Sequence, residues 1–198
     1  MPVEVFLALV ALIFAAAWTP GPNNALVASS AVNFGLRRTV PHMLGITLGF
    51  PVMILLVGLF LGELFQTSAV LREAVRWGGA ALLLWVAWSV ARTGGIGFGV
   101  ERARPFSLME AAAFQWINPK GWAMAAAITA QFIDPAAPWA SAGIVALVSV
   151  AAGLTSSLGW ALAGRAITRW LSTGRRLRLF NFVMGALIGL MVIFVLVS

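Results

Sequence analysis

Long apolar stretches run through most of this 198-residue chain and restrict its fold more than any other feature. A helix that crosses a bilayer needs about 20 mostly apolar residues, in a range of roughly 17–25. Six stretches approach or exceed this length, and short connectors separate them: Val3–Ser30, Thr39–Leu61, Ala74–Val90, Ser107–Ile133, Ser141–Ala163 and Leu179–Val197. The sequence therefore predicts an all-α polytopic membrane protein of six transmembrane helices, in a single transmembrane domain over residues 1–198.

Composition excludes a soluble enzyme or binding domain. The chain is 61% hydrophobic and 10% charged, whereas soluble domains are about 45–50% apolar and about 25% charged. The first stretch begins like a signal peptide, but Glu4 stands where a basic flank is expected, so we predict a retained helix. The chain contains no cysteine and one histidine, which argues against a metal site or cofactor. HExxH and GxSxG motifs are absent too, so we predict that the protein is not an enzyme.

The net charge of +7 comes from arginines in the connectors rather than from a basic patch for nucleic acid, and no nucleic-acid partner is predicted. Ten of the twelve arginines lie in the first, third and fifth connectors. Because positively charged short loops stay in the cytoplasm, these connectors should be cytoplasmic. We predict a multi-pass protein of a bacterial inner membrane with both termini in the periplasm.

Two polar, proline-containing interruptions break the first and fourth stretches, at Thr19–Asn24 and at Asn118–Gly121. Proline has no N–H to donate, so these prolines should leave three carbonyl groups without their helical partners, those of Ala16, Trp18 and Gln115. Such groups are tolerated at membrane depth only where protein, water or a ligand satisfies them. Both breaks should therefore face an interior cavity.

A helix that restarts after each break would point its unpaired N–H groups at that cavity. Asn118 is a good N-cap, Pro119 suits the first helical position, and Gly21 and Pro22 form a similar pair. Helix N-termini attract anions, so a carboxylate site is predicted there. Its candidate substrate-binding residues are Pro20, Gly21, Pro22, Asn23, Asn24, Asn118, Pro119 and Lys120.

The matching positions of the breaks suggest two three-helix repeats, over residues 1–92 and 107–198. An odd number of spans in each repeat makes the two repeats inverted, as in many secondary transporters that bind substrate near the midplane. The pattern alone supports this interpretation, because little else aligns between the halves.

Lys120 is the only lysine and lies in the middle of the fourth stretch. A cation there costs about 2.5–3.5 kcal/mol on insertion scales, which favours a functional role. A substrate carboxylate is the expected partner. The alternatives are that Lys120 caps loose carbonyl groups at the break or pairs with Glu110.

Two other ionisable side chains are candidates for ion coupling. Glu110 lies near the start of the fourth stretch, where it is either interfacial or carries a coupling proton. His42 titrates in the physiological range, although a lone histidine near a span end is commonly structural. Gly-x-x-x-Gly patterns, such as Gly45 with Gly49, permit close helix packing or a homodimer.

The sequence resembles the LysE/RhtB family of amino acid exporters. The resemblance rests on Pro20-Gly21-Pro22-Asn23 followed by Gly35-Leu36-Arg37-Arg38 and Gly45-x-x-x-Gly49, on Asn118-Pro119-Lys120, and on Gln131-Phe132. It implies amino acid efflux driven by an ion gradient, with protons as the coupling ion, and a central site at the two breaks.

The acidic residues of the sequence narrow the class of amino acid that the protein could export. A carboxylate should stand near a site for lysine or arginine, yet Glu110 is the only acidic residue within a span after the first. We therefore expect small neutral zwitterions. The alternatives are export of another small solute or cation, and a membrane protein without a transport role.

Overall fold

The computed structural model describes residues 1–61, 104–168 and 174–197, with scattered positions between 68 and 88. The third predicted stretch, Ala74–Val90, lies largely outside the described residues. Every regular element in the described ranges is helical, which confirms the all-α class. The elements are α1 (Val3–Trp18), α2 (Pro22–Phe34), α3 (Leu36–Leu56), the π-helical turn η1 (Val57–Leu61), α6 (Leu108–Phe114), the 3₁₀ turn η2 (Gln115–Ile117), α7 (Pro119–Phe132), α8 (Pro138–Thr168) and α9 (Gly174–Val197).

Several of these helices have the length and apolar character of membrane spans. In the part of the chain that is described, Leu36–Phe60 and Pro138–Ala166 are long enough to cross a bilayer. The pair α1 and α2 gives a third span if it crosses as one unit, and it is bent by 52° at the first predicted break. The chain is therefore a membrane protein whose first apolar stretch is broken between α1 and α2.

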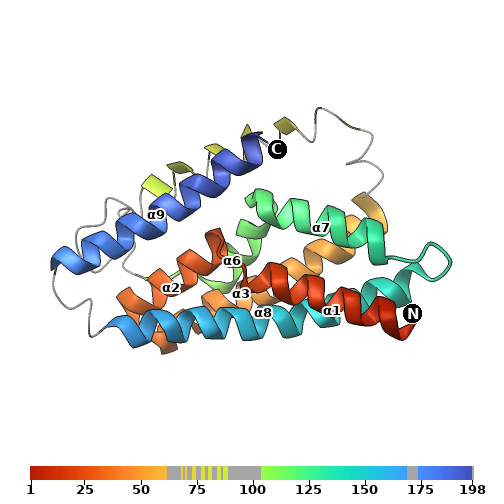
Figure 1. Ribbon diagram of the computed structural model, residues 1–198, viewed down its shortest axis with the longest axis horizontal. Helices are drawn as coiled ribbons and strands as arrows, with labels where there is room; N and C mark the ends of the chain where they lie inside the picture. The colour runs from red at the N-terminus through yellow and green to blue at the C-terminus, as the bar shows by residue number, and fades with distance from the viewer. Residues whose placement is uncertain are drawn as a thin grey trace.

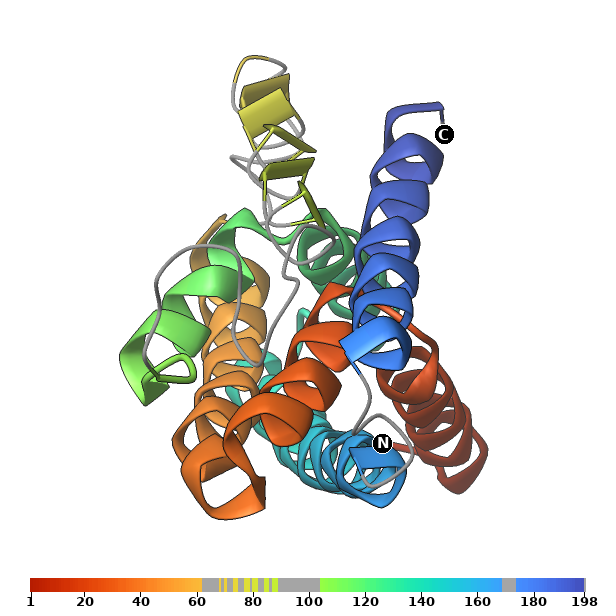
Figure 2. The same ribbon diagram turned by 90° about the vertical axis from the view of Figure 1, so that its left-hand side faces the viewer.

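Helix α8 organises the packing (Figures 1 and 2), because it lies along α1, α2 and α3. Helix α3 in turn packs along α6, and α9 lies against α2 on the outside of the bundle. One apolar cluster joins α1, α3, α7 and α8 around residues such as Ile13, Met53 and Val145. A second joins α2, α3, α6 and α8 around residues such as Val27, Ile46 and Ala111.

Glycines permit the closest helix crossings. A Cβ at Gly45 of α3 would overlap the Leu108 carbonyl at the start of α6, and one at Gly49 would lie 2.7 Å from the Cα of Ala112. On α8, a Cβ at Gly164 would meet the backbone of Ala28 in α2. Small residues at such crossings let helix backbones approach in the membrane, where packing replaces the hydrophobic effect as the driving force.

Helix α2 is polar for a membrane protein, yet it is buried on every face. Residues 24–32 are all buried, and they include Asn24, Ser29 and Ser30. Polar groups at membrane depth are stable only when protein or water surrounds them. The other helices wrap α2 and so place a polar strip through the centre of the bundle.

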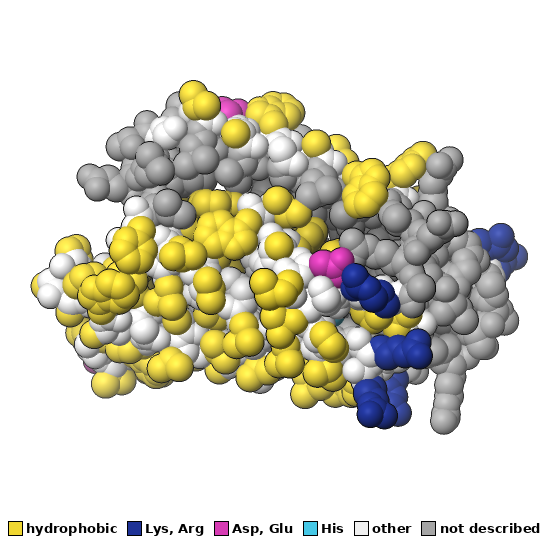
Figure 3. Space-filling model, turned by 180° about the vertical axis from the view of Figure 1, so that it is seen from behind, with side chains coloured by type: hydrophobic (Ala, Val, Ile, Leu, Met, Phe, Trp, Pro, Cys, Tyr) yellow, Lys and Arg dark blue, Asp and Glu magenta, His cyan; other side chains and the backbone are white. Residues whose placement is uncertain are grey.

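The outer surface has the opposite character. Large apolar side chains point outward along the bundle, among them Val52, Leu147 and Phe182, and Figure 3 shows such side chains spread over one face. The Lys and Arg side chains visible in that view gather at one end. The exposed described arginines belong to the first turn of α3, the segment before α6, the last turn of α8 and the beginning of α9: Arg37, Arg38, Arg104, Arg165, Arg175, Arg176 and Arg178. This distribution suits an apolar belt in lipid with one basic end.

Candidate functional site

The first break lies between α1 and α2, where the sequence predicts it. Helix α1 ends at Trp18 because two prolines follow, and a proline disfavours helical geometry in the residue before it. The backbone N–H and the hydroxyl of Thr19 both donate to the Ala15 carbonyl, at 2.9 and 2.7 Å, and so close the last turn. The chain restarts with Gly21 as N-cap and Pro22 as the first helical residue.

The second break separates α6 from α7. The helix tightens into the 3₁₀ turn η2, and Asn118 then takes an extended conformation as the N-cap of α7. Its side-chain oxygen accepts from the backbone N–H of Lys120 at 3.2 Å, which confirms the predicted cap, and Pro119 occupies the first helical position. Trp122 supports the turn, since its indole N–H donates to the Trp116 carbonyl at 2.8 Å.

Side chains satisfy the carbonyl groups that the first break exposes. The Asn24 amide donates to the carbonyls of Ala17 and Thr19, at 3.0 and 2.9 Å. The Ser156 hydroxyl of α8 also donates to Ala17, at 2.7 Å, and the Lys120 ammonium donates to Thr19 at 2.8 Å. Groups from α2, α7 and α8 therefore meet at the end of α1.

These acceptors differ by one residue from the predicted ones. The sequence analysis expected the carbonyls of Ala16 and Trp18 to need partners, on the assumption that α1 continues to the prolines. Because α1 stops at Trp18, the carbonyls that receive side-chain donors from other helices are those of Ala17 and Thr19. At the second break the Gln115 carbonyl accepts from the Asn118 N–H at 3.3 Å, which closes the 3₁₀ turn.

A reciprocal amide pair holds the two breaks together. Asn23 donates to the Gln115 side-chain oxygen at 2.9 Å, and Gln115 donates back to the Asn23 oxygen at 3.4 Å. Gln115 also donates to the Ala111 carbonyl at 2.9 Å, and its side chain is 0% exposed. The Gln115 side chain thus joins the second break to the start of α2.

Lys120 reaches across the same gap from α7 to the end of α1. Besides its bond to Thr19, its side chain lies close to Gly21, where a Cβ would stand 3.0 Å from Nζ and 3.1 Å from Cδ. The alternative in which Lys120 caps a loose carbonyl group is thus observed. An ammonium has three donors, however, so this bond leaves capacity for a further partner.

A cavity of about 60 Å³ lies between the two breaks and α8. One water needs about 10–15 Å³ on this measure, so the space suits a few waters or a small solute. Its polar lining residues are Asn23, Asn24, Gln115, Asn118, Lys120, Ser149, Ser156 and Ser157, and its apolar walls include Ile13, Ile46, Phe50 and Met124. Among these lining residues Lys120 carries the charge, and none is acidic.

Five of the eight candidate binding residues line this cavity: Gly21, Asn23, Asn24, Asn118 and Lys120. The prolines have a different role. Pro22 and Pro119 open α2 and α7, and Pro20 is an exposed part of the first break. The N-termini of both restarted helices thus stand at the cavity, where their N–H groups and partial positive charge favour an anion.

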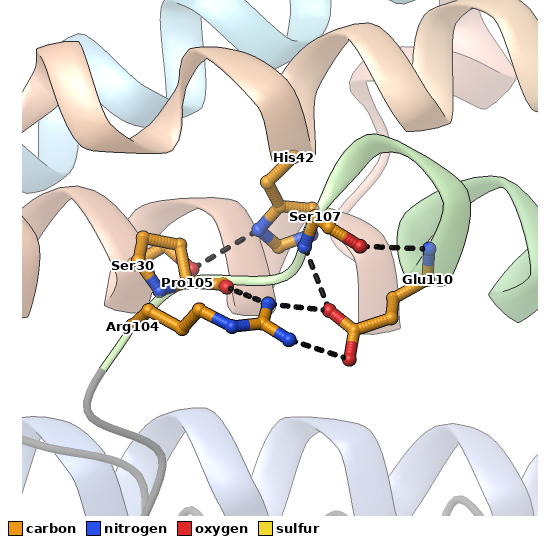
Figure 4. Close-up of polar contacts among 6 residues, drawn as sticks. All are labelled: Ser30, His42, Arg104, Pro105, Ser107 and Glu110. Atoms are coloured by element: carbon orange, nitrogen blue, oxygen red, sulfur yellow. Dashed lines mark hydrogen bonds and ion pairs between the residues drawn. The ribbon is translucent and has the colours of Figure 1, made fainter.

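Glu110 and His42 lie elsewhere, beside the start of α6 (Figure 4). The Glu110 carboxylate accepts from Arg104, at 2.7 and 3.2 Å, and from the Ser107 N–H at 2.8 Å in a capping box. The hydrogen bond from Arg104 to Glu110, and then their charge attraction, raise the pKa of Arg104. Buried His42 has its Nδ1 3.0 Å from the Ser30 hydroxyl, and its ring contacts Phe106. Neither candidate coupling residue lines the cavity.

The sequence analysis missed the serines of α8. Ser149, Ser156 and Ser157 recur at helical spacing on one face with Gly153, and all four line the cavity. The signal is weak because α8 is rich in small residues throughout. Only the packing of α8 across both breaks distinguishes these serines from others in the chain.

Comparison with known proteins finds matches over most of the chain. The family model for the LysE type translocator matches residues 14–198. A cysteine/O-acetylserine efflux protein of Klebsiella pneumoniae is 31% identical over 176 residues, with 87% of each chain covered. The protein of that description from Escherichia coli K12 is 32% identical over 170 residues, covering 82% of this chain and 84% of the relative. No solved structure matches.

Proposed function

Because this chain belongs to the LysE type translocator family, and is therefore a transporter rather than an enzyme, we propose that it exports small neutral amino acids across a bacterial inner membrane. The observation that carries the proposal is the cavity between the two breaks. It offers one cation, two helix N-termini and several amide and carbonyl oxygens, which together complement a zwitterion.

The cargo carboxylate docks against Lys120 and the start of α7. The Lys120 ammonium has donors beyond its bond to Thr19, and an ammonium–carboxylate pair in a protein interior is stronger than a bond to a neutral carbonyl. The cargo ammonium takes the Thr19 carbonyl once Lys120 has turned to the cargo carboxylate, together with the Asn24 side-chain oxygen, which its amide bonds leave free. Each end of a zwitterion thereby meets a complementary break.

The walls favour a short, uncharged cargo side chain. No carboxylate stands among the lining residues to neutralise a lysine or arginine side chain, and Lys120 is the charge present. An unpaired charge in such a site would cost several kcal/mol. The named cargo of the relatives, cysteine and O-acetylserine, is small and neutral, and we extend that class to this chain.

Transport would proceed by rocking of two inverted three-helix repeats about this site. The packing supports this scheme, because α8 lies along the broken pair α1–α2 much as α3 lies along the broken segment α6–α7. The basic end would face the cytoplasm, with both termini in the periplasm. Protons are the proposed coupling ion, and His42 and Glu110, near the basic end, are the candidate carriers.

Counterflow in proteoliposomes tests the proposal. Vesicles loaded in turn with neutral, basic and acidic amino acids should accumulate labelled tracer only with small neutral cargo. Lys120→Ala and Asn118→Ala should lower exchange at least tenfold, because loss of hydrogen bonds to a charged group costs about 1.5–3 kcal/mol.

The matched control is Asp134→Ala, which removes a charge in the connector after α7, outside the cavity lining. It should exchange at the wild-type rate. Exchange by folded Lys120→Ala at the wild-type rate and affinity would refute the carboxylate site. Absence of exchange with every amino acid, from folded wild-type protein, would refute amino acid export.

A further inference from the structure

The polar side chains of the cavity form two groups. Those of the first group already make hydrogen bonds to other parts of the protein. Asn23 and Gln115 bond to each other through both oxygen and nitrogen. On α8, the Ser149 hydroxyl donates to the Val145 carbonyl at 2.8 Å and the Ser156 hydroxyl to Ala17 at 2.7 Å. Both serines have therefore used their hydroxyl protons within the fold, so they have no donor left for a ligand.

The side chains of the second group still have a donor or an acceptor that could bind a ligand. Both N–H groups of the Asn24 amide go to carbonyls, which fixes its orientation and leaves its oxygen as an acceptor. The Asn118 oxygen accepts a backbone N–H, so its NH₂ group is left as a donor. Within the described part of the chain, the Ser157 hydroxyl has no hydrogen-bond partner, although the residue is only 4% exposed and lines the cavity.

The position of Ser157 separates it from the other ligand-facing groups. Asn24 belongs to the first break, and Asn118 and Lys120 belong to the second, where the carboxylate and ammonium of a cargo would dock. Ser157 lies on α8, which forms the wall common to both breaks and contributes to neither. The third substituent of an α-amino acid, its side chain, is the part left to face this wall.

We propose that Ser157 determines specificity by hydrogen bonding a polar group on the cargo side chain. This inference rests on the proposed function and narrows it to amino acids with a short side chain bearing a hydroxyl, thiol or ester oxygen. The Ser157 hydroxyl lines the cavity with its hydrogen-bonding capacity unused among the described residues, and a site built to bond a substrate hydroxyl disfavours an analogue that lacks it. The neighbouring Ser156 differs from it, because the Ser156 hydroxyl already donates its proton to the Ala17 carbonyl.

The experiment compares serine with 2-aminobutyrate, in which a methyl replaces the hydroxyl at almost constant shape. KM for exchange of each is measured in proteoliposomes with wild type, Ser157→Ala, Ser157→Thr and the matched control Ser156→Ala. Wild type should prefer serine. Ser157→Ala should reduce the KM preference for serine about two- to tenfold, the effect of one neutral hydrogen bond, and Ser157→Thr should keep most of it. Ser156→Ala should change both KM values by the same factor.

KM does not depend on the amount of active protein, and the ratio of the two KM values cancels any change in affinity that is common to both compounds. A ratio that stays at its wild-type value in Ser157→Ala would overturn the inference, as would a wild type that exchanges both compounds equally well. Failure of wild type to exchange any amino acid would instead overturn the proposed function, so the two failures are distinguishable.

Discussion

Lys120 must serve two partners in turn. In the present structure it donates to the Thr19 carbonyl, and in the proposed cycle it binds the cargo carboxylate. A buried cation without any partner would be expensive, so the carbonyl keeps the ammonium satisfied between cargoes. The half-buried position of Lys120, beside a glycine in the opposite break, lets its flexible stem move between them.

We predict that Gly21→Ala weakens cargo binding without unfolding the protein. The new Cβ would stand 3.0 Å from the Lys120 nitrogen, so the ammonium must shift, whereas the extended backbone at Gly21 accepts any residue. Partial loss of one charge-assisted hydrogen bond predicts a roughly three- to tenfold rise in KM. Exchange kinetics and thermal unfolding in detergent measure both effects. A wild-type KM would show that Lys120 does not need its present position.

Side chains that act on nearby backbone could be predicted from the sequence, and those with distant partners could not. Asn118 precedes a proline after an apolar run, and this local pattern predicts the N-cap that is observed. Gln115 bonds to Asn23, which is 92 residues away, and no local pattern encodes that pairing. No local pattern distinguishes Ser157 either, because it lines the cavity only through the packing of α8 against the other helices.

The crossing of α3 and α6 depends on glycine, and we predict that Gly45→Ala destabilises the folded protein. Its Cβ would overlap the Leu108 carbonyl, a backbone atom that cannot swing aside. Overpacking of this kind costs about 1–3 kcal/mol. Thermal unfolding in detergent should show a lower midpoint.

Gly143→Ala is the matched control for this substitution. It lies in α8 with nothing within 4 Å of the added Cβ, and alanine is the better helix former by roughly 0.5–1 kcal/mol. Its unfolding midpoint should equal or exceed that of wild type. If Gly45→Ala were as stable as Gly143→Ala, the close approach of α3 and α6 would not be required.

At the level of elements, proline alone did not determine where helices break. Both predicted breaks are present, at Pro20-Gly21-Pro22 and at Asn118-Pro119. Helix α3 nevertheless continues through Pro41 and Pro51. The difference is local chemistry, because the breaks combine proline with glycine or a capping asparagine, which stabilise the end of one helix and the start of another.

For the whole molecule, we predict that the basic end lies in the cytoplasm. The chain has no cysteine, so single cysteines introduced at Arg38 and at Ala136 report sidedness without background. Both positions are exposed, one at the start of α3 and the other in the connector between α7 and α8. A membrane-impermeant maleimide added to intact spheroplasts should label Ala136→Cys and leave Arg38→Cys unlabelled until the membrane is permeabilised. The reverse pattern would invert the topology.

The amide pair between Asn23 and Gln115 also bears on the energetics of the complete cycle. If the halves separate here, the bonds that break and re-form are between neutral groups, so the contact itself moves no charge through the membrane. A zwitterionic cargo likewise carries no net charge. The membrane potential, about 2.3 kcal/mol per elementary charge per 100 mV, would then act on the transporter only through its coupling ion and its own ionised side chains. Voltage dependence of export would thus report the charge of the coupling ion together with any movement of the protein's own ionised side chains.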